Sequence, residues 1–111
     1  MNPPLQELIV TPGWKVEYHQ FHVIDTATAA ADEEIRFLFK EDMYQARNDG
    51  SDRMIDLGWY PEFDLANGEF RLVLYAGDFR GELLREFRTK SRQSVVDTMN
   101  EWFNAVTDGN T

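Results

Sequence analysis

The 111-residue chain contains no cysteine. It can therefore form no disulfide, no cysteine-based zinc site and no thiol nucleophile, which is typical of proteins kept in a reducing compartment. Long apolar runs are also missing. Nothing approaches the ~20 apolar residues of a membrane-spanning helix, and no basic leader precedes an apolar export signal. We therefore expect a cytoplasmic protein that does not enter a membrane.

Motifs that carry catalysis or hold metals are lacking as well. The chain has no Gly-rich phosphate loop, nucleophile elbow or metal-binding helix motif. Its only two histidines, His19 and His22, stand three apart in a segment with a strand pattern, where they point to opposite faces and cannot chelate one ion together. The sequence predicts no catalytic residue, no metal site and no cofactor, and hence a protein that is not an enzyme.

Core-forming residues are plentiful. Hydrophobic residues make up 42% of the chain and aromatic residues 14%, which is too rich for a disordered polypeptide. A chain of this length buries roughly two-thirds of the surface that its unfolded form exposes. We expect residues 1–111 to form a single domain with its own core.

The formal net charge of −9 is unevenly distributed. Residues 1–69 contain 14 acidic and 5 basic residues, whereas residues 70–111 contain 6 of each. An acidic field repels nucleic acid and anionic membranes but attracts cationic proteins. Acidity can also serve solubility alone. The basic residues near the C-terminus alternate with acids, and we interpret them as cross-strand partners rather than a nucleic-acid stripe: Arg80, Arg85, Arg88, Lys90 and Arg92.

In the first half of the chain, residues 1–13 are predicted to be an arm with one helical turn at Leu5, Leu8 and Ile9. Residues 14–24 have the composition of a strand with a bulge near His19 and Gln20. Residues 25–34 suit a loop containing a helical turn. Ile35, Phe37 and Phe39 alternate with charged residues and predict a half-buried strand that fades into a turn at 48–52.

The second half has clearer signals. Ile55, Leu57 and Trp59 alternate as a strand that Pro61 ends. Asn67-Gly68 predicts a two-residue hairpin turn with positive φ, followed by a central strand at 70–75. A further turn at 77–81 leads to a strand at 83–88, and Ser91 caps an amphipathic helix at 92–106. We predict an α+β fold in which a single antiparallel sheet of about five strands, within residues 14–88, packs against the long C-terminal helix.

Residues 41–64 combine acids with aromatic side chains. Carboxylates steer and pair with lysine or arginine, while Trp and Tyr supply compact contact area, so this segment suits the capture of a cationic partner. A polar face over a packed Trp59 is the alternative interpretation. The predicted partner-binding residues are Glu41, Asp42, Asp49, Asp52, Asp56, Trp59, Tyr60, Glu62 and Asp64.

Roughly the last half of the chain resembles the small immunity proteins of bacterial contact-dependent growth inhibition and related polymorphic toxin systems. The resemblance lies in GWYP (58–61), GEFRLVLY (68–75), LLREF (83–87) and VVDTMNEWF (95–103). It implies a cytoplasmic inhibitor that binds the C-terminal domain of its cognate toxin, often a cationic nuclease. Immunity families share no catalytic residues, so the resemblance assigns none.

Two other functions remain open from the sequence. One is a small-molecule binder or minor enzyme with a pocket between sheet and helix that includes His19 or His22. The other is a generic acidic protein-interaction module that imitates nucleic acid.

Overall fold

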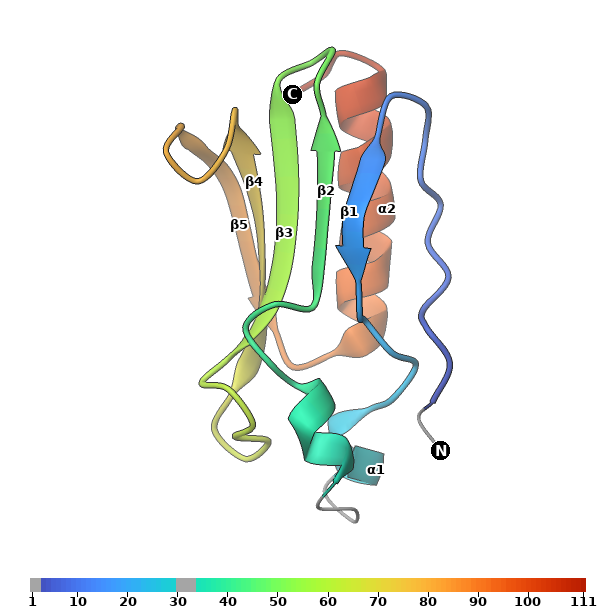
Figure 1. The fold of residues 1–111 in the computed structure, drawn as a ribbon, viewed down its shortest axis with the longest axis vertical. Coiled ribbons are helices and arrows are strands. Elements are labelled where there is room, and N and C mark those ends of the chain that lie inside the picture. The colour runs from blue at the N-terminus through green and yellow to red at the C-terminus, as the bar shows by residue number, and fades with distance from the viewer. Residues whose placement is uncertain (1–2, 30–33) are drawn as a thin grey trace.

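The computed structural model describes residues 3–29 and 34–111. Five antiparallel strands form one sheet in the order of the sequence, and a 16-residue helix, α2 (Arg92–Thr107), lies across one face (Figure 1). The strands are β1 (Lys15–His19), β2 (Tyr44–Asn48), β3 (Arg53–Tyr60), β4 (Glu69–Ala76) and β5 (Leu83–Thr89). The predicted α+β fold is confirmed.

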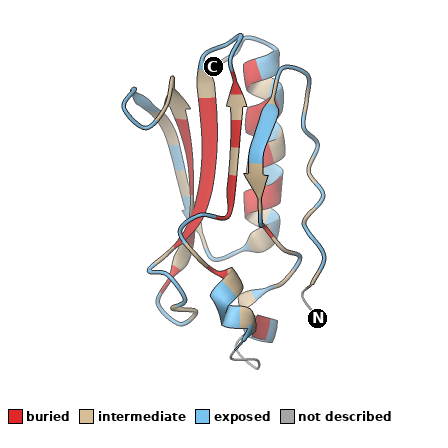
Figure 2. Cartoon of the chain, in the orientation of Figure 1, coloured by how far each residue is buried: buried red, intermediate tan, exposed pale blue. Residues whose placement is uncertain are grey.

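Alternation along β3 and β4 divides the sheet into two faces. Ile55, Leu57 and Trp59 of β3 are fully buried in the core that α2 shares, as are Phe70 and Leu72 of β4. Figure 2 shows that β3 is coloured as buried along most of its length. Each such side chain contributes roughly 1.5–3 kcal/mol on burial, so this layer dominates stability. The helix supplies the matching stripe: Val95, Val96, Met99, Trp102, Phe103 and Val106. The intervening residues of the strands lie on the other face, which no helix covers in the described part of the chain.

The segment before β2 differs from the prediction. Ile35–Leu38 form a 3-10 helix, η1, and not a strand, while Thr26–Ala29 form the expected helical turn, α1. A run of five alternating residues satisfies either geometry, because a three-residue turn also places Ile35 and Leu38 on one side. The rest of the predicted loop, residues 30–33, lies outside the described residues.

The N-terminal segments are also arranged differently. The bulge in β1 lies between Val16 and Tyr18, two residues earlier than predicted, and the strand ends at His19. The arm is extended and has no helical turn within its described residues. Leu5 instead forms an isolated antiparallel bridge with His22. The backbone hydrogen bonds of that bridge replace those that a helical turn would have made.

The β3–β4 connection is longer than the predicted two-residue turn. It runs from residue 61 to residue 68, and neither Asn67 nor Gly68 has a positive φ. Gly68 is required for a different reason: a Cβ atom there would lie 2.2 Å from Nε1 of Trp59. The positive φ in this loop, 64°, belongs to Phe63. A bulky residue in that conformation is strained, and the surrounding contacts must hold it there.

Ser91 provides a test of the helix boundary. Its side chain accepts a hydrogen bond from the Ser94 backbone N–H, as predicted for the N-cap. Ser91→Ala should lower the free energy of unfolding by about 1 kcal/mol in urea denaturation, because the first turn loses an acceptor for its free N–H groups. Ser94→Ala is the matched control and should change stability by less than about half as much. Equal effects of the two substitutions would contradict the capping role.

Candidate partner-binding surface

The nine predicted partner-binding residues do not form one patch. They follow the β2–β3 hairpin and the loop after it, and therefore spread over the length of the sheet. Asp49 and Asp52 lie at the β2–β3 turn, and Glu41 and Glu62 lie near the opposite end of β3. The eight residues of β3 extend over about 25 Å at ~3.3 Å per residue. The acidic segment thus contributes to two separate surfaces.

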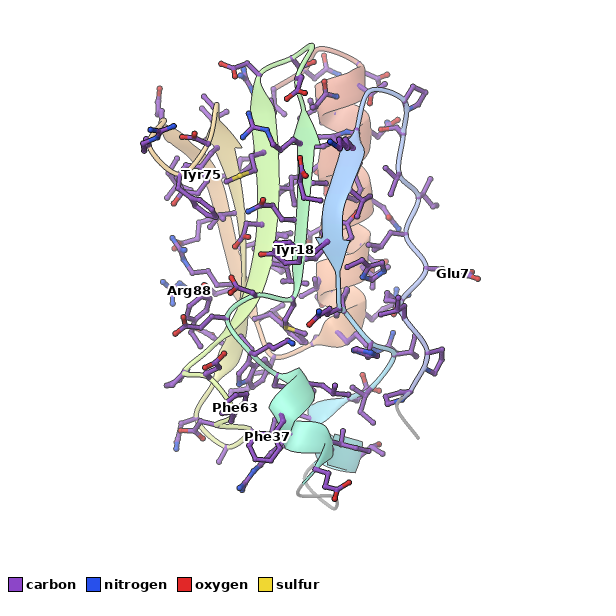
Figure 3. The ribbon with its side chains drawn as sticks, viewed as in Figure 1. Glu7, Tyr18, Phe37, Phe63, Tyr75 and Arg88 are labelled. Atoms are coloured by element: carbon purple, nitrogen blue, oxygen red, sulfur yellow. The ribbon has the colours of Figure 1, made fainter. Side chains whose placement is uncertain are left out.

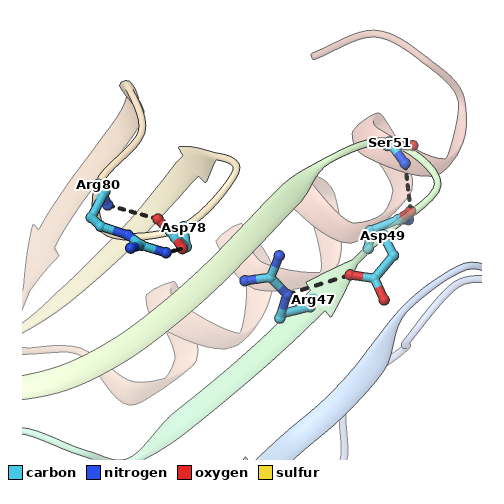
Figure 4. Close-up of polar contacts among 6 residues, drawn as sticks. Arg47, Asp49, Ser51, Asp78 and Arg80 are labelled. Carbon is cyan, nitrogen blue, oxygen red and sulfur yellow. Dashed lines mark hydrogen bonds and ion pairs between the residues drawn. The ribbon is translucent and has the colours of Figure 1, made fainter.

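At the β2–β3 turn the Asp49 side chain and the Asp52 backbone make local contacts. An oxygen of Asp49 lies 3.4 Å from Nε of Arg47, and Asp78 pairs with Arg80 at 3.0 Å on the neighbouring hairpin (Figure 4). The Asp52 carbonyl accepts a hydrogen bond from the Gly77 backbone N–H, which ties the two hairpins together. Exposed ion pairs of this kind contribute little to stability, and the two charges of each pair partly cancel.

At the opposite end, residues 40–43 cross beside β3. A Cβ atom at Gly58 would lie 2.2 Å from the Glu41 carbonyl oxygen, so only glycine allows this approach. The Glu62 carboxylate accepts the Glu41 backbone N–H at 3.2 Å, and the Tyr60 hydroxyl lies 3.4 Å from the Glu41 carbonyl. Glu41, Asp42, Tyr60 and Glu62 are therefore brought together at this end.

Asp64 folds the β3–β4 loop. Its carboxylate accepts the backbone N–H of Asn67 at 3.0 Å and the side-chain amide of the same residue. These hydrogen bonds, the backbone one first, hold the pKa of Asp64 below its ordinary value. The predicted binding residue Asp64 is thus already engaged within its own loop.

Trp59 corrects the prediction of a surface anchor. Its side chain is 0% exposed and packs edge to face on Phe39 and Phe70, with ring centroids 5.0 and 4.9 Å away. Its Nε1–H donates to the Asp64 carbonyl at 2.9 Å. The indole belongs to the core because its inward position on β3 faces α2, as the alternative interpretation had it.

Two exposed aromatic residues that the sequence did not single out lie at the same end. Phe37 of η1 and Phe63 of the β3–β4 loop form an edge-to-face pair with centroids 5.0 Å apart, and they are 49% and 38% exposed (Figure 3). The alternating pattern placed Phe37 inside a strand. No sequence signal marked Phe63, because its exposure follows from the unexpected loop conformation. This pair offers the aromatic anchor that Trp59 cannot.

A solvent-open groove of about 550 Å³ lies on the uncovered face. It is lined by side chains from β1, β2, the segments next to them and the β3–β4 loop: Tyr18, Gln20, Lys40, Asp42, Gln45 and Glu62. Tyr18 reaches from β1 across β2 (Figure 3) to Asp56 of β3, with 3.4 Å between its hydroxyl and the carboxylate. The Tyr18 side chain thus covers Asp56, and only 6% of Asp56 is exposed.

Burial raises the pKa of Asp56 from 3.8 to about 6. Hydrogen bonds from Gln45 and Tyr18 and the charge of Arg71 oppose this rise, while the nearby charge of Asp42 adds to it. Burial, together with Asp56 and Asp42, also raises the pKa of the Tyr18 phenol. Asp56 is therefore a carboxyl group whose charge changes near neutral pH.

The two histidines are bound to the backbone. Nε2 of His19 lies 2.8 Å from the Gln6 carbonyl, and Nδ1 accepts the Phe21 N–H at 3.2 Å. Nδ1 of His22 lies 3.0 Å from the Gln20 carbonyl. Within residues 3–29 and 34–111, no three His, Asp or Glu side chains gather as metal ligands, and no helix is long and apolar enough to cross a bilayer.

Comparison of the chain with family models, with curated proteins and with solved structures gives no match. The resemblance to immunity proteins therefore stays a prediction from sequence. What the structure contributes is the α+β fold and the geometry of the surfaces described above.

Asp56→Asn tests the buried carboxyl. The folded chain holds this proton more tightly than the unfolded chain, so the folded state is favoured at low pH and loses stability as the pH rises from about 4 to about 6. An asparagine side chain does not ionise, so the variant does not lose stability over this pH range. The variant should be more stable than the native protein by on the order of 1–3 kcal/mol near pH 7.5, and the difference should vanish below about pH 4. Urea denaturation at several pH values measures it, and a difference independent of pH would contradict this assignment.

Proposed function

We propose that this chain is an immunity protein that binds a cognate toxin domain with a cationic surface, a nuclease, and neutralises it by stoichiometric inhibition in the cytoplasm. It would act by protein–protein contact, without catalysis, a cofactor, direct nucleic-acid binding or membrane binding. One observation carries the proposal: the exposed pair Phe37 and Phe63 lies at the end of the molecule where Glu41 and Glu62 meet.

The carboxylates at this end remain available to a partner. Among the described residues, no lysine, arginine or histidine nitrogen lies within 4 Å of the carboxylates of Glu41, Asp42 or Glu62. The acids near β4 and β5, in contrast, are paired: Glu86 lies 2.7 Å from Arg71, and Glu69 lies 3.5 Å from Arg88. Unpaired surface carboxylates accelerate encounter with a cationic protein, and rigid aromatic rings beside them supply buried contact area.

Several basic side chains near β4 and β5 are also paired within the chain. Of the five basic residues predicted to pair across strands, Arg88 pairs with Glu69 across β4 and β5, whereas Arg80 pairs with Asp78 in its own turn and Arg92 pairs with Asp25. Nζ of Lys90 donates to the Ala66 carbonyl at 2.8 Å, and Arg71, which was not in that group, pairs with Glu86 across the same two strands. These side chains are engaged within the chain. Two cations lie near the aromatic end as well: the Arg36 guanidinium lies over the Phe37 ring, 5.1 Å from its centroid, and Lys40 lines the groove beside Asp42 and Glu62.

The packing between sheet and helix counts against a small-molecule pocket there. Tyr44, Leu57 and Phe103, which face this seam, are each fully buried, and rings from both layers meet within it. His19 packs its ring against Tyr44 and uses both ring nitrogens on the backbone. This packing favours a binding surface on the outside of the molecule.

Co-expression tests the function directly. The toxin domain encoded beside this chain should kill bacteria that produce it alone, and producing both proteins should restore growth and yield a 1:1 complex on size-exclusion chromatography. A catalytically inactive toxin domain serves as the control for complex formation. Absence of both rescue and complex would end the proposal.

A charge-reversal pair locates the interface. Glu41→Lys with Glu62→Lys changes the charge at the aromatic end, whereas Asp49→Lys with Asp52→Lys makes the same change at the β2–β3 turn. The first double variant should slow association with the toxin domain by about tenfold or more at low salt, and the second by much less, because steering depends on proximity to the interface. Stopped-flow association rates measure both. A larger effect of the turn variant would move the interface to that end.

A further inference from the structure

Asp42 and Asp56 stand apart from the acids that are paired with arginine. Their carboxylates converge on the single hydroxyl group of Tyr18, at 3.4 Å from each. A phenol has one proton to donate, so it can satisfy only one of the two carboxylates at a time. In the described part of the chain, neither carboxylate has a cationic side chain within 4 Å.

The contact between Gln45 and Asp56 does not supply the missing hydrogen-bond donor. The Gln45 amide lies 3.5 Å from Asp56, and hydrogen bonds beyond about 3.2 Å are weak. Asp56 is 6% exposed, so water reaches it only slightly and its charge is screened less than that of a surface acid. The groove wall beside Tyr18 therefore combines excess acceptors with a poorly screened negative charge.

We infer that this groove, between Tyr18, Asp42 and Glu62, is a binding site for the guanidinium group of an arginine side chain. A guanidinium group brings five donors in a planar fork, which can serve both Asp42 and Asp56 where the Tyr18 hydroxyl offers them one proton, and it stacks on an aromatic ring. Asp42 is exposed at the rim and meets the cation directly. Asp56 acts from beneath through its charge.

The arginine would come from the toxin domain, and in that respect the inference rests on the proposed function. The inference adds one specific contact to the surface formed by the aromatic pair. This contact lies in the groove on the open face of the sheet, beside β1 and β2. Lys40 lines the same groove and repels an incoming cation. Replacing Lys40 should therefore strengthen binding, which a purely structural role of the groove does not predict.

The probe is N-acetyl-argininamide, titrated into isotopically labelled protein at low ionic strength and followed by NMR. We expect saturable shifts centred on Tyr18, Asp42 and Gln45. Asp42→Asn and Asp56→Asn should each weaken binding by about threefold or more, and Lys40→Gln should strengthen it by about twofold, as for charges near a partly screened site. Asp49→Asn, at the distant turn and already paired with Arg47, is the matched control and should bind as the native protein does.

Binding should also weaken as the pH falls through about 6, where Asp56 takes up a proton, and Asp56→Asn should remove this dependence. N-acetyl-lysinamide should bind less tightly, because an ammonium group lacks the planar fork. Shifts that never saturate, shifts centred on the β2–β3 turn, or equal binding by Asp42→Asn would overturn the inference. Asp42 is on the surface, so its variant tests the site even if Asp56→Asn disturbs the sheet. Because the probe requires no toxin, this result is distinguishable from failure of rescue or complex formation.

Discussion

The burial of Trp59 is the contact on which both the core and the candidate surface depend. Its ring fills the space between Phe39 and Phe70, and its indole N–H holds the carbonyl of Asp64 in the following loop. The backbone N–H of Trp59 donates to the Lys40 carbonyl, which fixes the segment before β2. Through its ring, its indole N–H and its backbone N–H, Trp59 thus positions the two loops from which Glu41, Glu62 and the aromatic pair project.

The sheet has two faces of different character. The inner face is closed by α2 and is almost entirely apolar. The open face carries a polar network in which Arg71 binds Glu86 at 2.7 Å near one edge, while Asp42 and Asp56 share one hydroxyl near the other. Charge is therefore compensated on the β4–β5 side of this face and left over on the β1–β3 side. Asp42 and Asp56 thus account for part of the excess acidity of residues 1–69.

The helices and strands that could be predicted from the sequence were those with long hydrophobic patterns. Four turns of the apolar stripe predicted α2, the alternation along β3 predicted its inner face, and the nearly continuous apolar run of β4 predicted a central strand. The pattern at Ile35–Phe39 was too short to separate a strand from a 3-10 turn, so Phe37 was placed incorrectly. The Asn67-Gly68 signal failed because the loop is organised by Trp59 and Asp64, which lie outside the dipeptide.

The candidate site was only partly predictable for a related reason. Acidic residues close in sequence were grouped together, yet a hairpin carries Asp49 and Glu62 to opposite ends. Tyr18 comes from another strand, and its approach to Asp56 depends on sheet register and on the bulge in β1. The cationic partner stays a prediction from composition, and the surface proposed for it depends on contacts that only the three-dimensional structure supplies.

The order of the strands bears on how the chain is made. Each strand pairs with the one before it in sequence, so the sheet can assemble hairpin by hairpin as the ribosome releases it. The helix that covers the inner face follows all five strands. Until α2 has emerged, the nascent sheet therefore presents an uncovered apolar layer with two free edges, and this is the interval in which the chain is most exposed to aggregation and most dependent on chaperones.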